Sequence, residues 1–173
     1  MIHRCLRAGL LLGLILLMTS CGYRFADSAP GRIQPGSSVW VAFVVNESVS
    51  STAQTVLRRA LYDEAHIMRG LQAGESYSRS DLRVSGRLTS YAIKAISYTA
   101  ADRIREYGLT IDVELELYRS GETAPLWRGT LQATKEFPAN SDLALQRNAE
   151  EAALLEAGHQ LARRFLTTVE QGY

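Results

Sequence analysis

The sequence predicts an α/β two-layer sandwich, with two helices packed on one face of a four-stranded mixed sheet. Three observations predict this class. An apolar run typical of a strand precedes an amphipathic helical segment, three alternating segments follow one another, and a second long amphipathic segment comes last. The expected order is β-α-β-β-β-α. Because each helix has one apolar stripe, both should cover the same face of the sheet and leave the other face open.

The first strand is expected at residues 39–45, an unbroken apolar run typical of a strand that is central in a sheet or buried on both faces. The first helix should follow, because Ser51 and Gln54 have the spacing of a capping box. Gly70 is expected to end this helix. The apolar positions at helical spacing are Leu57, Ala60, Leu61, Ala65 and Met68.

Three alternating segments predict three further strands. The first starts at Leu82, and its apolar phase slips after Ser90, which indicates a β-bulge. The second covers residues 107–117, and the third has Trp127 and its alternate neighbours inward. Antiparallel pairing should bring arginines of the outer strands opposite acids of the middle strand. The candidate arginines are Arg83, Arg87 or Arg128, and the acids are Asp112, Glu114 and Glu116.

A long final helix is expected over residues 143–169, capped by the Asn140-Ser141-Asp142 segment. Early acids and late arginines suit the dipole of this helix. Its predicted buried stripe contains Leu154, Leu155, Gly158, Leu161, Ala162, Phe165 and Val169.

The N-terminus predicts export. Arg4 and Arg7 precede an apolar run at residues 8–18. This run is shorter than the roughly 20 residues needed to span a bilayer. Two small residues follow it and lead to Cys21, as in a cleavable signal. This order resembles a bacterial lipoprotein signal, in which residues 1–20 are removed and acyl chains such as palmitate are attached to the cysteine. A plain secreted protein with a free cysteine is the alternative. Because Cys5 lies within the signal, Cys21 would be the sole mature cysteine, and acylation accounts for it.

The remaining chain is expected to form one domain. Residues 21–38 are predicted to be a lipidated N-terminus and tether, because they are rich in Pro, Gly and Ser, and residues 39–170 form the folded domain. Without residues 1–20, which hold two arginines, 17 cations face 18 acids. This balance gives no general attraction to nucleic acid.

No enzyme signature is present. His66 and His159 each lack a second His or Cys at helical spacing, so we expect neither a metal site nor a cofactor. Both are expected to be partly exposed helix histidines. The alternating acids at residues 112–116 are better explained by strand pairing with arginines than by acid–base chemistry. We therefore expect a non-catalytic protein.

Several motifs resemble those of the LptE family of LPS-assembly lipoproteins. They are Cys21-Gly22-Tyr23-Arg24-Phe25, Val39-Trp40-Val41-Ala42-Phe43 with Asn46 and Ser48, Glu106-Tyr107, Leu126-Trp127, and Leu161-Ala162-Arg163-Arg164-Phe165. The resemblance implies an outer-membrane lipoprotein on the periplasmic side that plugs and stabilises an LPS-exporting β-barrel, an LptD-like subunit. In bacterial lipoproteins an Asp after the cysteine favours the inner membrane, and Gly22 here points to the outer one.

The resemblance also implies that the chain binds lipopolysaccharide. Lys94, Arg103, Arg105 and Arg147 are the counterparts by position of family cations that contact LPS phosphates. A guanidinium binds phosphate oxygens bidentately, so the chemistry fits. The alternative is a free-standing lipid- or glycan-binding lipoprotein. That alternative requires an apolar cavity, whereas the Leu, Val and Ala residues at inward positions predict a filled core.

Overall fold

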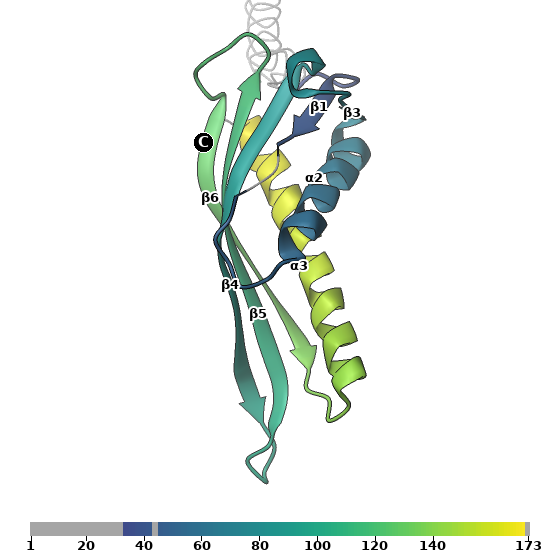
Figure 1. The fold of residues 1–173 in the computed structure, drawn as a ribbon, viewed down its shortest axis with the longest axis vertical. Coiled ribbons are helices and arrows are strands. Elements are labelled where there is room, and N and C mark those ends of the chain that lie inside the picture. The colour runs from purple at the N-terminus through teal and green to yellow at the C-terminus, as the bar shows by residue number, and fades with distance from the viewer. Residues whose placement is uncertain (1–32, 43–44, 172–173) are drawn as a thin grey trace, which may run out of the picture. The chain divides into compact units, whose positions relative to one another are not determined.

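The computed structural model describes residues 33–42 and 45–171. The predicted signal at residues 1–20 and Cys21 lie outside the described residues. The elements, shown in Figure 1, are β1 (Ser38–Val41), β2 (Val45–Asn46), α2 (Ala53–Arg69), β3 (Gln72–Ala73), η2 (Tyr77–Arg79), β4 (Leu82–Tyr98), β5 (Ile104–Arg119), β6 (Trp127–Pro138) and α3 (Leu143–Gln171).

The predicted α/β sandwich with a mixed sheet is confirmed, although within the described residues the sheet has six strands and not four. Its order is β3-β1-β4-β5-β6, and β2 pairs with β4 beside β1. β1 and β2 run parallel to β4, and β4, β5 and β6 are antiparallel. The additional strands are β2 and β3, each only two residues long.

The strand expected at residues 39–45 is shorter and buried in alternation. In β1, Val39 and Val41 are buried in the core, while Trp40 is half-buried. The Arg58 guanidinium of α2 lies 5.6 Å from the centre of a Trp40 ring. Trp40 therefore makes a cation–π contact with Arg58 and is not buried in the core. Ile33 is also buried, which shows that the core begins within the predicted 21–38 tether segment.

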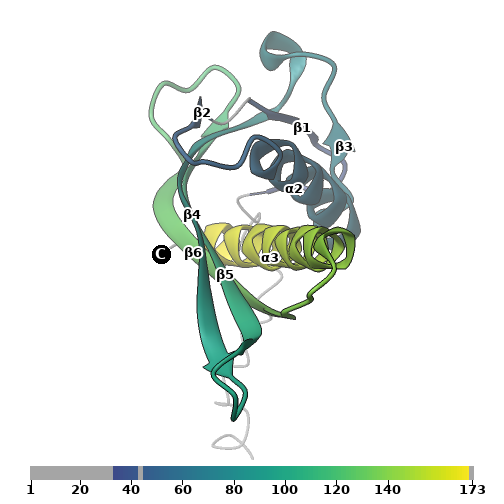
Figure 2. The ribbon, with the colours of Figure 1, turned by 60° about the horizontal axis from the view of Figure 1, so that its bottom comes forward.

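α2 and α3 lie side by side over one face of the sheet (Figure 2). They approach closely because α3 has Gly158 at the crossing, where an added Cβ would lie 3.4 Å from that of Ala60. The predicted α3 stripe is buried except for Leu155, which is 43% exposed. Ala153, Ala157 and Leu166 complete the buried surface of α3.

The helix ends agree with the sequence at two of three predicted signals. Gly70 adopts φ 62° and donates its N–H to the His66 carbonyl at 2.8 Å, ending α2 as expected. Asp142 Oδ1 accepts the N–H groups of Ala144 and Leu145, which caps α3. The capping box at Ser51 is wrong. α2 starts one residue later, at an N-cap whose side chain makes no capping hydrogen bond, and Ser50 Oγ accepts the Ala53 N–H instead.

β4 and β5 form one long hairpin that extends past the start of α3 in Figure 1. The predicted bulge is confirmed as a register shift between Leu88 and Ser90. β6 pairs with β5 only as far as Glu106. We call residues 93–106 the hairpin end. It includes the β4–β5 turn and the part of the hairpin nearest to it.

Candidate functional site

The hairpin end exposes large apolar side chains. Ile96 is 46% and Tyr98 58% exposed, and Ile93 and Ile104 are also exposed. Among the described residues, no strand lies on the outer side of β4 beyond Leu88, where β2 ends, and we call this edge open. At the start of α3, Leu143 and Leu145 are exposed as well. Apolar surface is therefore concentrated where the helices no longer cover the sheet.

The structure brings the four predicted LPS-binding cations to this end of the fold. Lys94, Arg103 and Arg105 lie on the hairpin end, and Arg147 lies near the start of α3. Arg105 Nη2 lies 3.2 Å from Glu106 Oε2. Among the described residues, the other three side chains form no salt bridge, so their charges are available to a ligand or partner.

Glu106 is held as a carboxylate. The Ser97 hydroxyl donates to Glu106 Oε2 at 2.6 Å, and this bond is the main cause of the lowered pKa of Glu106, with the Arg105 guanidinium next. The bond also joins β4 to β5 beside two register shifts. One negative charge therefore partly offsets the cations of the hairpin end.

On the open face of the sheet, one of the predicted pairs between an arginine and an acid of β5 is present. Glu116 lies opposite Arg128, and the pair forms a 2.6 Å salt bridge. The attraction of Glu116 raises the pKa of Arg128. Arg87 lies opposite Glu114 in register, but its salt bridge is with Glu47, at 3.5 Å.

Two further charged positions of the open face, Arg83 and Asp112, also have partners within the fold. Arg83 donates to the backbone carbonyls of Arg119 and Glu122, so Arg128, and not Arg83, makes the expected contact with an acid of the middle strand. Gln132 donates to Asp112 Oδ1 at 2.7 Å. Asp112 and Glu116 therefore each contact a side chain of the neighbouring strand. This agrees with the expectation that these acids serve strand pairing and not acid–base chemistry.

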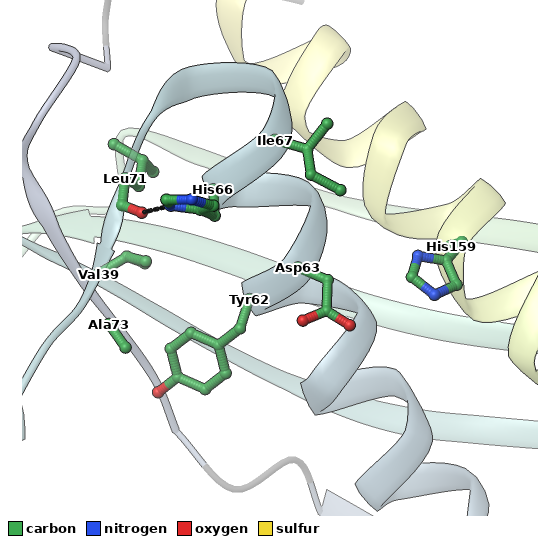
Figure 3. A pocket seen from close by; sticks show the side chains of 8 residues that line it. All are labelled: Val39, Tyr62, Asp63, His66, Ile67, Leu71, Ala73 and His159. Carbon is green, nitrogen blue, oxygen red and sulfur yellow. Dashed lines mark hydrogen bonds between the residues drawn. The ribbon is translucent and has the colours of Figure 1, made fainter.

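A groove of about 480 Å³ lies beside α2, as Figure 3 shows. His66 and His159 enter it from different helices. His66 Nδ1 lies 3.1 Å from the Leu71 carbonyl oxygen, and His159 Nδ1 lies 2.9 Å from Glu64 Oε1. Within the described part of the chain, no three His, Cys, Asp or Glu side chains form a group able to hold a metal ion.

His159 belongs to a cluster that the sequence did not reveal. Glu64 of α2 is 5% exposed, and one of its oxygens accepts hydrogen bonds from His159 and from Arg163 Nη1 at 2.7 Å. The three residues join α2 to α3. His159 and Arg163 lie one turn apart on α3, but Glu64 is 95 residues earlier on α2, so no local spacing could have indicated that the three meet.

The core between the sheet and the helices is filled. The space bounded by Ile33, Leu61 and Phe165 among others has a volume of about 10 Å³, too little for a lipid or a sugar. Leu57, Val113 and Leu161 are almost completely buried. The described core thus lacks the apolar cavity that a free-standing lipid carrier would need. No helix in the described ranges has the length and apolar character needed to cross a membrane.

Comparison with known proteins relates the whole sandwich to one family. The family model described as lipopolysaccharide-assembly, LptE, matches residues 37–169. This range extends from the residue before β1 to near the end of α3. No curated protein matches the chain.

Solved structures resemble this chain at low sequence identity, and the first two described here share its fold. A PelC dodecamer from Paraburkholderia phytofirmans has a TM-score of 0.56 at 15% identity, covering 82% of this chain and 96% of that one. The protein CT253 from Chlamydia trachomatis has a TM-score of 0.55 at 10% identity, with coverages of 78% and 96%. The rare lipoprotein B from Shewanella oneidensis has a TM-score of 0.48 at 16% identity, with coverages of 78% and 94%.

Proposed function

Because this chain belongs to the LptE family of lipopolysaccharide-assembly lipoproteins, we propose that it plugs and stabilises an LPS-exporting β-barrel of the outer membrane. The family match over residues 37–169 is the observation that carries the proposal. The family is non-catalytic, so the chain is an assembly factor and not an enzyme. Its proposed partner is an LptD-like barrel subunit.

The sandwich has the properties that a plug needs. Its core is filled, so it can occupy a lumen without collapsing. The open face of the sheet presents side chains such as Arg128, Thr130 and Gln132, which suit the polar interior of a barrel. Its strands are held to one another by side-chain contacts across the sheet, including that of Arg128 with Glu116.

Lipopolysaccharide is the proposed ligand of the cations at this end of the fold. Lys94, Arg103 and Arg147 have no salt bridge within the described ranges, and phosphate groups would supply the missing negative charge. Arg105 shares its charge with Glu106 and should contribute less. These four residues lie on two elements at the same end of the fold.

The membrane anchor is proposed to be acyl chains on Cys21. Residues 1–20 would be the cleaved signal, residues 21–38 the tether, and residues 39–170 the domain. Several acyl chains together hold a protein on a membrane stably, whereas one chain gives only marginal binding. The protein would thus reside on the periplasmic side of the outer membrane.

Affinity capture through a C-terminal tag, from detergent-solubilised cell envelope, tests the proposed partner. A large β-barrel protein should co-purify with the tagged chain. Recovery of the chain only as a free monomer would favour the free-standing lipoprotein over the plug. Cys21→Ser should release the chain from washed membranes, and mass spectrometry of the mature N-terminus should show the acyl chains.

Charge reversal tests the ligand. We expect Arg103→Glu with Arg105→Glu to weaken LPS binding at least about tenfold and to leave the circular dichroism spectrum unchanged. Arg59→Glu with Arg79→Glu is the matched control, because these arginines are exposed and lie outside the hairpin end. Equal affinity of the two double variants would remove Arg103 and Arg105 from the binding site.

A further inference from the structure

We propose that the outer edge of β6 pairs, strand to strand, with an extended segment of the barrel subunit that lies inside its lumen. This inference rests on the proposed function, because it requires a barrel around the domain. It goes further by naming a backbone contact and the β6 residues that make it.

β6 is the last strand of the sheet and pairs with β5 alone. Among the described residues no strand lies beyond it, and it forms a border of the sheet in Figure 2. Its register with β5 continues from Pro138 to Trp127 without a shift. Because an antiparallel strand bonds to each neighbour through every second residue, half of the backbone groups of β6 point away from β5.

A hydrogen bond at the end of the strand shows which residues these are. The Ala139 N–H donates to the Arg105 carbonyl at 2.9 Å, in the same register as the β5–β6 pairing. The odd-numbered residues of β6 therefore bond to β5, and the even-numbered ones turn their N–H and C=O groups outward. These exposed outward residues are Arg128, Thr130, Gln132, Thr134 and Glu136.

The other described edges of the sheet are protected against strand addition, whereas β6 is not. β3 closes the opposite side and is only two residues long. The edge of β4 beyond Leu88 is distorted by register shifts on both sides of Ser97. β6 has twelve residues, no register shift and no proline before Pro138. A long regular edge of this kind is a template for another strand, so we expect a partner to cover it.

The side chains along this edge suit a polar partner. Those of the outward residues are hydroxyl, amide or charged groups. On the helix-covered side, Lys135 lies opposite the buried Leu109, and its ammonium is 3.7 Å from Glu156 of α3. An added strand would therefore meet a paired charge there and not an isolated one. The lumen of a barrel is a polar environment of this kind.

Glu136 gives the added strand a charge preference. Its neighbour on β5 is Gly108, which has no side chain, and within the described residues Glu136 forms no salt bridge. Arg128, near the other end of β6, is already bound to Glu116 at 2.6 Å. One negative charge of the outward residues thus lacks a counter-charge. We expect Lys or Arg in the partner segment opposite Glu136.

The occupant is a lumen segment because the alternatives fit the enclosed domain less well. The barrel wall cannot supply the strand, since each strand of a closed barrel already pairs on both sides. A second copy of the chain would have to share the lumen with the first, which a one-domain plug leaves no space for. A segment between two wall strands that folds inward has free backbone groups and lies against the plug.

Amide hydrogen exchange, resolved to single residues, tests the pairing. It compares the mature lipidated chain in detergent with the purified complex of the same chain and the captured barrel. In the free chain, the amides of Thr130, Gln132 and Thr134 should exchange at least about a hundredfold faster than those of Leu131 and Ala133. In the complex, both sets of amides should exchange slowly, because both are then hydrogen-bonded.

Proline substitution tests the same backbone groups. Thr130→Pro with Thr134→Pro removes two outward N–H donors and no hydrogen bond to β5. It should lower the amount of captured barrel at least about tenfold. The matched control, Thr130→Ala with Thr134→Ala, removes the same side chains but keeps the N–H groups, and should capture the barrel as the parent chain does. Thermal unfolding of the free variants checks that the sandwich is folded.

Charge reversal tests the expected counter-charge. Glu136→Lys should lower the capture several-fold, because the partner cation would then face a like charge. Glu151→Lys is the matched control, since Glu151 is exposed on α3 and lies away from the outer edge of β6. Equal capture by these two variants would contradict a cation opposite Glu136.

Several outcomes would overturn the proposal. If the barrel is captured but the outward amides still exchange fast, the edge is unpaired, and the proposed function stands without this contact. Equal capture by the proline and alanine variants would assign the contact to side chains. Slow outward amides in a free chain that light scattering shows to be a dimer would assign the edge to a second copy. If the parent chain captures no barrel, the proposed function fails and this inference fails with it.

Discussion

The two ends of the β4–β5 hairpin belong to one continuous pair of strands but meet different surroundings. Near Leu88, β4 has β2 on its outer edge, and its inward side chains are buried. Beyond Ser90, no strand in the described part of the chain covers the outer edge of β4, and Ile93 is exposed although it pairs with the fully buried Leu109. In the sandwich the apolar side chains are buried under the helices and stabilise the fold, whereas at the hairpin end several of them are exposed to solvent. Strand pairing alone therefore does not bury a side chain, and a covering layer is also needed.

The largest expected effect tests the sandwich. Val113→Asp places a charge at a fully buried position of β5, and an unpaired buried charge costs several kcal/mol, so we expect a loss of about 3–5 kcal/mol or failure to fold. Val45→Asp makes the same chemical change at a 58% exposed residue and should cost less than about 1 kcal/mol. Urea unfolding measures both. Similar losses would contradict the difference in burial.

Glu64→Gln tests the contact between α2 and α3. Glu64 Oε1 accepts hydrogen bonds from His159 and Arg163, and the buried amide keeps only part of this bonding, so about 1–3 kcal/mol should be lost. Glu156→Gln is the control, since its salt bridge with Lys135 is 3.7 Å long and its side chain is 64% exposed. Thermal unfolding should separate the two. An unchanged Glu64→Gln midpoint would show that the cluster is not needed for helix packing.

Asp142→Ala tests the end of α3 that lies near the hairpin end. Losing the cap for the Ala144 and Leu145 N–H groups should cost about 1 kcal/mol. The effect should be local, with faster hydrogen exchange in the first turns of α3 and little change around Phe165 in its buried part. Uniform acceleration along the whole helix would contradict a local cap.

The sequence predicted what depends on short-range periodicity. The alternation in β4, β5 and β6, the stop at Gly70, the cap at Asp142 and the bulge after Leu88 all follow from residues close together in the chain. β2 and β3 were missed because two residues carry no period. Leu155 fits a helical stripe by spacing, but the position of the sheet and α2 decides which side of α3 is buried.

The candidate site was predictable in part. Lys94, Arg103, Arg105 and Arg147 came from a family resemblance, and only the fold shows that they share one end of the domain. The exposure of Ile93 and Ile96 was not predictable, since alternation cannot tell where the helices stop covering a sheet. The Glu64 cluster depends on the approach of two helices that are far apart in sequence.

The smallest expected effect compares two hydrogen-bonded carboxylates, one in each region. Asp81 Oδ2 accepts the Ser38 N–H at 2.8 Å and the Ser38 hydroxyl at 2.7 Å, which lowers the pKa of Asp81 and ties β1 to the start of β4. The pKa of Glu106 is also lowered, by Ser97 first, but this bond lies within the hairpin end.

A lowered folded-state pKa stabilises the fold above the unfolded value, about 3.9 for Asp, and this stabilisation is lost as the pH falls through the folded value. Asp81→Asn should therefore lower the urea midpoint slightly at about pH 7 and converge with the parent chain below about pH 4. The effect is small because Asp81 is exposed to solvent. Glu106→Gln should instead accelerate hydrogen exchange within residues 93–106 and leave the global midpoint unchanged, since the sandwich does not depend on the hairpin end. A drop in the global midpoint equal to that of Asp81→Asn would show that the two regions unfold as one unit.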